Sequence, residues 1–205
     1  GIYSVEKLVV ARRFMYWQVY LHKTGLAAEN ILVKMLKRSR ELVRAGKEVP
    51  MTPVLSVFME NEVTSESFDK QILEAYAKLD DTDLIHGMKA WCDNEDFILS
   101  YLSRSIVNRR LPKVVMSDKP FDPKKIEDIR EKIGNRFSIG ESELDYLVYS
   151  GEVSNLVYKT EPMGIRIALK SGETIDIKDA SGYAGIAGLD QKTTRYFLCY
   201  PKKPT

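Results

Sequence analysis

Residues 12–23 read Arg-Arg-Phe-Met-Tyr-Trp-Gln-Val-Tyr-Leu-His-Lys, and this stretch decides how the first half of the chain is interpreted. At 100° per residue, Arg12, Tyr16, Tyr20 and Lys23 fall within about 80° of one another on a helix. Cations bind phosphate, and flat rings pack against a sugar or a base. The stretch therefore predicts a helix with one face suited to a nucleotide polyphosphate.

A separate apolar stripe predicts which side of the helix packs in a core. It consists of Val10, Phe14, Trp17, Leu21 and Ala28. Aromatic and basic side chains on a helix also occur together for packing alone, with the charged ends reaching into solvent. The residues by themselves leave a nucleotide face and a purely structural face both open.

The neighbouring residues resemble one enzyme family. The pattern Arg12-Arg13-x-Met15-Tyr16-Trp17-Gln18-x-Tyr20-x-His22-Lys23, preceded by Tyr3-Ser4-x-Glu6-Lys7, is similar to HD-superfamily phosphohydrolases of the dNTP triphosphohydrolase type (dGTPase-like, or sterile-alpha-motif/HD-like). It matches the region that follows their metal-binding core.

The resemblance implies a role for four residues. Arg12 would contact a substrate phosphate, Tyr20 the sugar, and His22 with Lys23 a regulatory nucleotide or phosphate. Tyr16 stands where the family has a histidine, and its hydroxyl would donate to a phosphate oxygen.

The metal ligands of the HD family are not recognisable in the sequence. The resemblance implies a His, a His-Asp pair and a distant Asp around a metal that activates water. The two histidines, His22 and His86, are instead followed by Lys23 and Gly87. We therefore expect no catalytic or metal-binding residue here, and we expect the chain to be the C-terminal part of a longer enzyme whose upstream part holds a divalent metal. Alone, it is expected to be inactive.

Two functions of different classes remain open. In the first, the parent enzyme hydrolyses a deoxynucleoside triphosphate to the deoxynucleoside and triphosphate, and this chain binds the substrate as part of a homo-oligomer. In the second, the chain is a non-catalytic module for oligomerisation or for binding a regulatory nucleotide.

Composition restricts the other classes of function. With 31 Lys and Arg against 29 Asp and Glu, the net charge of +2 predicts no general attraction to nucleic acid or to a membrane. No run of 18 apolar residues and no signal-peptide pattern occurs, so we expect a cytoplasmic protein. Cys92 and Cys199 are too few for a disulfide framework and lack zinc-site spacing.

Helical patterns dominate the first half. One runs through residues 3–45 almost without a break, and it ends at a basic cluster that suits the helix dipole or a bound phosphate: Lys37, Arg38, Arg40 and Arg44. Shorter helices are predicted at 54–60, 68–79, 83–92 (capped by Asp81 or Thr82) and 94–109. Arg109-Arg110 follows, either as a solvated pair or as a phosphate contact.

Alternating patterns dominate after Pro112. Strands are predicted at 113–116, 153–158 and 195–200, and a hairpin at 165–177. Residues 144–149 also alternate. Asp122-Pro123 predicts a helix start, with Gly134 as its stop, and Gly182, Gly185 and Gly188 predict a loop.

The sequence thus predicts an α+β protein, in which a helical half led by a long helix precedes a smaller lobe with a mixed or antiparallel sheet and one helix. We place the helical region, the C-terminal part of an HD-type helical domain, at residues 1–111 and the small α/β lobe at residues 112–205. The family resemblance implies that this lobe serves assembly and regulation.

Overall fold

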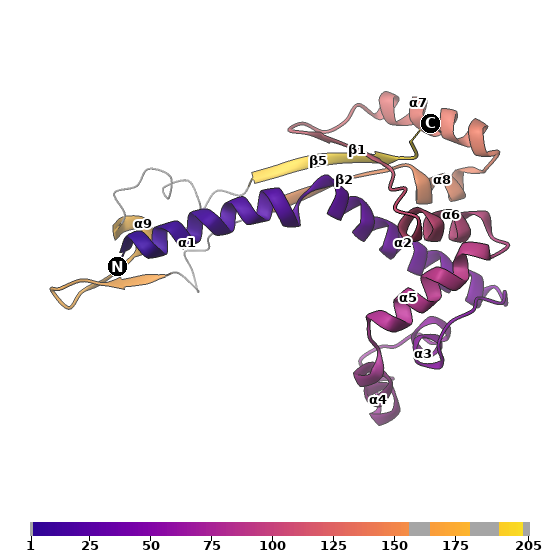
Figure 1. Cartoon of the computed structure of the whole chain (residues 1–205), viewed down its shortest axis with the longest axis horizontal. Helices are drawn as coiled ribbons and strands as arrows, with labels where there is room; N and C mark the ends of the chain where they lie inside the picture. Colours follow the sequence, from indigo (N-terminus) through magenta and orange to yellow (C-terminus); the bar gives the residue numbers. More distant parts are fainter. Residues whose placement is uncertain (1, 156–164, 181–192, 203–205) are drawn as a thin grey trace. The chain divides into compact units, whose positions relative to one another are not determined.

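The computed structural model describes residues 2–155, 165–180 and 193–202, and the structural statements below concern these residues. The fold is α+β, as the sequence predicts (Figure 1). In chain order the elements are α1 (Ile2–Met15), η1 (Tyr16–Tyr20), α2 (Lys23–Arg44), α3 (Pro53–Glu60), α4 (Lys70–Lys78), α5 (Asp81–Ala90), η2 (Trp91–Asp93), α6 (Phe97–Val107), β1 (Lys113–Ser117), α7 (Pro123–Phe137), α8 (Glu141–Leu147), β2 (Tyr149–Asn155), β3 (Arg166–Ala168), β4 (Thr174–Asp176), α9 (Ile177–Ala180) and β5 (Thr193–Tyr200).

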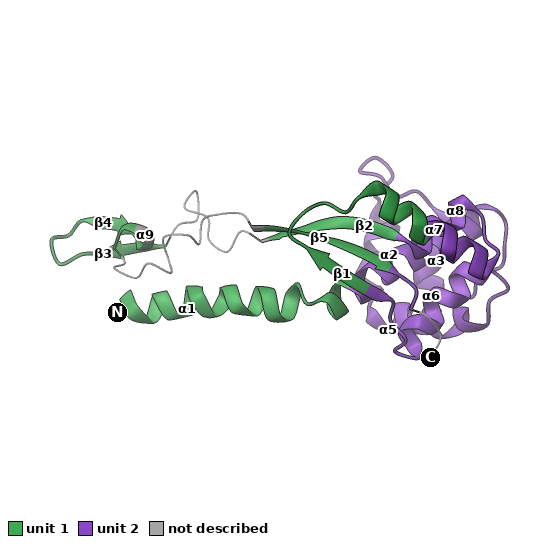
Figure 2. Cartoon of the chain, turned by 90° about the horizontal axis from the view of Figure 1, so that it is seen from above, with its two compact units in different colours: residues 1–26, 114–129, 149–199 green, residues 27–113, 130–148, 200–205 purple. Residues whose placement is uncertain are grey.

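The chain forms two compact units, each assembled from three segments (Figure 2). Unit 1 contains residues 1–26, 114–129 and 149–199, and unit 2 contains residues 27–113, 130–148 and 200–205. At one point the chain passes from unit 2 to unit 1 between Lys113 and Val114, close to Pro112. The units nevertheless divide the chain differently from a split into residues 1–111 and 112–205, because α2 and α7 each contribute residues to both units.

The predicted continuous helix over residues 3–45 is wrong in one place. After α1 the chain makes a π-helical turn, η1, in which the Leu21 amide donates to the Tyr16 carbonyl at 2.7 Å, five residues back. Within five residues, η1 carries three large rings and the β-branched Val19, and such residues lose side-chain freedom in an α-helix. The regular α-helix resumes at Lys23.

The apolar stripe predicted for this helix is also wrong in part. Phe14 is 56% exposed, whereas Val9, next to the predicted Val10, is 5% exposed. Val9 and Ile177 form a small core in unit 1, with three partly buried residues packed against it: Val5, Ile165 and Ile167.

Unit 2 is built around α2. Ile31, Met35 and Ser39 are buried at intervals of four residues, which places them on one side of the helix. Trp91 is fully buried, and its indole nitrogen donates to the Pro50 carbonyl at 2.6 Å. The helices around this core begin at side-chain caps provided by Thr52 for α3, Asp69 for α4, Asp80 for α5 and Asp96 for α6. The cap of α5 is therefore Asp80, and not Asp81 or Thr82 as predicted.

The strands form two sheets. In the first, β5 lies between β1 and β2, and β2 pairs with it antiparallel from Tyr149 opposite Cys199 to Asn155 opposite Thr193. In the second, β3 and β4 form the predicted hairpin. Gly172 takes a φ of +86° in its turn, a conformation that favours glycine. The predicted loop at Gly182, Gly185 and Gly188 lies outside the described residues.

Candidate functional site

The structure brings the three predicted substrate-binding residues together as a stack on the surface of α1 and η1. The guanidinium carbon of Arg12 lies 5.5 Å from the centre of the Tyr16 ring, and an Arg12 nitrogen lies 3.5 Å from the Tyr16 hydroxyl. The Tyr16 and Tyr20 ring centres are 5.2 Å apart, with an angle of 45° between the planes. A cation and two phenol rings thus form one continuous strip, which we call the Arg12 stack.

The Arg12 stack is open to solvent. Arg12 is exposed, Tyr16 is half-buried and Tyr20 is 60% exposed. No carboxylate among the described residues forms an ion pair with Arg12. The guanidinium therefore keeps donors available for an anion, and the Tyr20 ring has a surface available for stacking.

His22 and Lys23, the predicted regulatory residues, follow directly after the π-helical turn. Both are exposed. The His22 ring accepts a hydrogen bond at Nδ1 from the Thr24 amide at 3.3 Å, as an N-cap side chain does. His22 thus stabilises the start of α2, whatever else it contacts.

Sequence reasoning missed a second contact of this turn. The guanidinium carbon of Arg195, on β5, lies 5.0 Å from the centre of the Trp17 ring. Arg195 Nε in turn lies 3.4 Å from an Asp118 carboxylate oxygen. The two contacts join residues that are distant in sequence, so no local pattern could have indicated them.

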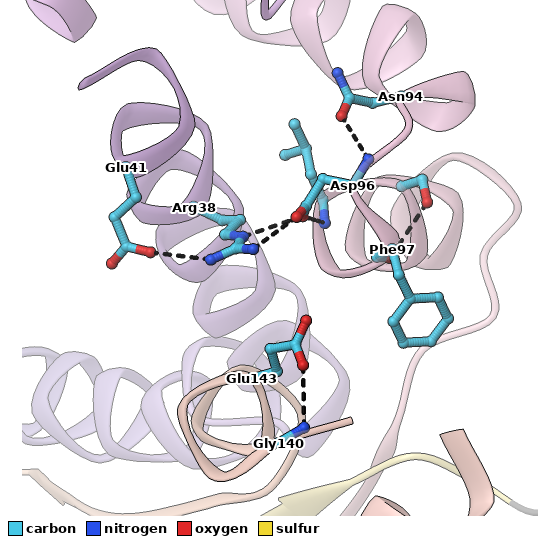
Figure 3. Close-up of polar contacts among 9 residues, drawn as sticks. Arg38, Glu41, Asn94, Asp96, Phe97, Gly140 and Glu143 are labelled. Atoms are coloured by element: carbon cyan, nitrogen blue, oxygen red, sulfur yellow. Dashed lines mark hydrogen bonds and ion pairs between the residues drawn. The ribbon is translucent and has the colours of Figure 1, made fainter. Parts of the chain in front are cut away.

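The basic cluster at the end of α2 is occupied by internal partners. Arg38 donates to both carboxylate oxygens of Asp96, at 3.0 and 2.6 Å, and also contacts Glu41 (Figure 3). Arg40 donates to the Asn61 carbonyl at 2.9 Å. Lys37 pairs with Glu41 at 4.0 Å, and Arg44 pairs with Glu62 at 3.6 Å. The phosphate interpretation of this cluster therefore has little support in the structure.

The Arg109-Arg110 pair instead lines a cavity of about 720 Å³ within unit 2, which we call the basic pocket. Five basic side chains line it. Arg104 lies on α6 and Arg136 on α7, whereas Arg109 and Arg110 follow α6 and Lys202 follows β5. Phe97 and Tyr101 also line it, with ring centres 5.7 Å apart, and its lining includes no Asp or Glu from the described ranges. Arg104 pairs with Asp93 at 3.2 Å, and Arg136 donates to the Lys202 carbonyl at 2.7 Å.

No group of three or more His, Cys, Asp or Glu side chains among the described residues is placed to hold a metal ion. These residues therefore do not fit a divalent cation. In the described part of the chain, none of the helices is long and apolar enough to cross a membrane.

Comparison with known proteins gives one relative and one solved structure of interest. No protein-family model matches the chain. The chain is 30% identical over 212 residues to the uncharacterized protein YwfO of Bacillus subtilis (strain 168), covering 98% of this chain and 46% of that protein. It also resembles the crystal structure of a phosphohydrolase from Bacteroides thetaiotaomicron VPI-5482, with a TM-score of 0.91 and 36% identity, covering 98% of this chain and 51% of that one.

The chain thus spans about half the length of both proteins. The high TM-score, together with the sequence identity, shows that its fold is that of the matching half of a phosphohydrolase.

Proposed function

We propose that this chain forms the phosphate- and sugar-binding part of a metal-dependent HD-type phosphohydrolase that converts a deoxynucleoside triphosphate to the deoxynucleoside and triphosphate. The Arg12 stack is the observation that carries the proposal, because a guanidinium and two phenol rings lie side by side on an exposed surface. The similarity to a phosphohydrolase of known structure supports the class of reaction.

Each member of the stack has a separate task in this proposal. Arg12 neutralises phosphate charge, and a charge-assisted contact of this kind contributes about 1.5–3 kcal/mol. The Tyr16 hydroxyl, already within reach of Arg12, donates to a phosphate oxygen. The exposed ring of Tyr20 packs on the sugar.

The metal that activates water is bound outside this chain in the proposal. The family resemblance puts the metal ligands upstream of the Arg12 stack, and about half of each similar protein lies outside the match. This chain then binds and orients the substrate, and by itself does not hydrolyse it. The whole enzyme would be a homo-oligomer.

Calorimetry with dGTP and with inorganic tripolyphosphate tests the proposal on the chain as given. We expect weak binding of both, unchanged by a chelator. Arg12→Ala should weaken binding by about tenfold or more, from the energy of the lost contact. Arg13→Ala removes an adjacent cation of equal charge and serves as the matched control. Equal affinities of these two variants, or tight binding that needs a metal, would contradict the proposal.

The basic pocket favours a second candidate function, a regulatory site for a nucleotide or another phosphate compound. Five cations converge there, and only Arg104 has a carboxylate partner among the described residues. Like charges held together repel one another, and a bound polyphosphate would remove that repulsion. The cavity volume is within the range of small-ligand sites. The family resemblance assigns His22 and Lys23 to such regulation as well.

A titration with tripolyphosphate followed by amide NMR separates the two candidates. Shifts at Ser105 and Arg110 would report the basic pocket, and shifts at Arg12 and Tyr16 would report the Arg12 stack. Arg110→Glu should abolish only the first set, whereas Lys124→Glu, the same charge change at an exposed lysine outside the pocket, should abolish neither. No shift at Ser105 or Arg110 in the unmodified chain would exclude the regulatory pocket.

A further inference from the structure

The Arg12 stack is built across a π-helical turn, and such turns are frequent at functional sites. In η1 the Leu21 amide donates to the Tyr16 carbonyl at 2.7 Å, so donor and acceptor are five residues apart where an α-helix has four. The His22 amide then donates to the Val19 carbonyl at 3.3 Å, which closes the turn. The relative placement of Tyr16 and Tyr20 therefore depends on whether this turn is kept.

Within the described part of the chain, Trp17 is the member of the turn whose side chain contacts a residue outside its own helix. It is half-buried, and the Arg195 guanidinium lies 5.0 Å from the centre of its ring, within the range of a cation–π contact. Among the described residues, the side chains of Arg12 and Tyr20 have no such contact, and each of them packs against Tyr16 instead.

Arg195 is itself held in place from two directions. Its backbone belongs to β5, the middle strand of the three-stranded sheet, where it lies opposite Val153. Its side chain is oriented by Asp118, just after β1, through the 3.4 Å ion pair. The sheet of unit 1 therefore presents the Arg195 guanidinium, paired with Asp118, to the Trp17 ring.

We propose that Arg195 and Asp118 are positioning residues: by holding Trp17 they maintain the π-helical turn, and so set the spacing of the phosphate- and sugar-contacting groups of the Arg12 stack. The part that concerns ligand binding rests on the proposed function, whereas the part that concerns the turn does not. Neither residue touches the substrate in this scheme.

We call the contacts of Arg195 with Trp17 and Asp118 the clamp. The first experiment tests the clamp without any ligand. The chain has two tryptophans, so 5-fluorotryptophan labelling gives two ¹⁹F resonances, which Trp17→Phe assigns. Arg195→Ala should shift the Trp17 resonance and raise the hydrogen-exchange rate of the Leu21 amide. It should leave the Trp91 resonance unchanged, since Trp91 is buried in unit 2.

Two variants serve as controls. Arg195→Lys keeps a cation that can lie over the face of the ring, and it should retain part of the contact and so give smaller changes than Arg195→Ala. Arg166→Ala removes an exposed arginine from β3 and should change neither reading. An unmoved Trp17 resonance, or an unchanged exchange rate at Leu21, in Arg195→Ala would overturn the proposal.

The second experiment measures dGTP affinity in the same variants. Loss of the clamp should weaken binding by about two- to fivefold, the change expected from one exposed cation–π contact. Asp118→Asn should give a smaller loss in the same direction. Unweakened dGTP binding in a variant whose Leu21 amide exchanges faster would overturn the positioning role and leave the proposed function intact. If the unmodified chain does not bind dGTP, the proposed substrate is refuted, and so is the effect of the clamp on binding. The exchange rate of the Leu21 amide still decides in that case whether the clamp maintains the turn.

Discussion

Arg38 and Asp96 face each other as a two-pronged ion pair, with Nε to Oδ1 at 3.0 Å and Nη2 to Oδ2 at 2.6 Å. The pair links α2 to the start of α6, because Asp96 also accepts from the Leu99 amide at 2.9 Å and caps α6. The two side chains are only 21% and 15% exposed. A geometry of this kind couples helix capping to the packing of unit 2.

Removing the Asp96 carboxylate should therefore destabilise the protein more than removing a carboxylate from an exposed ion pair would. We expect Asp96→Ala to lower the free energy of unfolding by roughly 2–4 kcal/mol, because Arg38 loses its partner and α6 loses its cap. Asp93→Ala is the matched control, since Asp93 pairs with Arg104 at 3.2 Å on the exposed surface. Urea unfolding measures both variants, and equal losses would contradict a special role for Asp96.

The same pair predicts a pH dependence of stability. Burial by itself raises the pKa of Asp96, but hydrogen bonds from Arg38 and Leu99 and the Arg38 charge bring this pKa below its ordinary value. A carboxylate with a lowered folded pKa stabilises the protein above its unfolded pKa of about 3.9, and this contribution is lost as the pH falls through the folded pKa. The difference in unfolding free energy between the unmodified chain and Asp96→Asn should be constant above pH of about 5 and shrink below pH of about 4. A constant difference down to acid pH would show that Asp96 titrates normally.

Gly87 and Gly25 should respond oppositely to the same substitution. A Cβ at Gly87 would lie 2.8 Å from the ring of the fully buried Trp91, so we expect Gly87→Ala to cost about 1–3 kcal/mol through overpacking. A Cβ at Gly25, in the first turn of α2, meets nothing closer than 4.0 Å, and Gly25→Ala should stabilise by up to about 1 kcal/mol. Thermal unfolding compares the two, and a stabilised Gly87→Ala would mean that α5 can move away from Trp91.

The start of α7 shows which signals the sequence carries reliably. Asp122 followed by Pro123 predicts the start of a helix, and α7 begins at Pro123, because capping depends on neighbouring residues alone. The predicted stop at Gly134 fails, since α7 continues to Phe137. A Cβ at Gly134 would meet a Leu144 methyl at 3.3 Å, so this glycine permits close packing of α8 and does not end the helix.

Residues 144–149 alternate as a strand does, but most of them belong to the helix α8. Leu144 and Leu147, three residues apart, are both buried in α8, so a helix also places these side chains in the core. At the start of α8, the Glu143 carboxylate accepts a hydrogen bond from the Gly140 amide at 3.0 Å (Figure 3). One apolar pattern was therefore compatible with both structures, and tertiary packing decided between them.

At the candidate site, the sequence predicted which residues meet but not what holds them. Arg12, Tyr16 and Tyr20 follow one another at intervals of four residues, and this spacing predicts that they share one face of a helix. The π-helical turn and the contact of Trp17 with Arg195 depend on a strand from the far end of the chain. The cations of the basic pocket likewise come from separate segments that only folding assembles.

His22 offers a test that separates a structural role from a role in ligand binding. Its ring accepts from the Thr24 amide at the start of α2, so His22→Ala should cost about 0.5–1 kcal/mol of stability through loss of this cap. His22→Asn keeps a side-chain acceptor at the same position and should retain that stability while it removes the imidazole. If His22 contacts a regulatory nucleotide, both variants should bind the nucleotide more weakly, although only the alanine variant is less stable. Full nucleotide binding by His22→Asn would leave His22 as a helix cap alone, and calorimetry together with thermal unfolding distinguishes the two results.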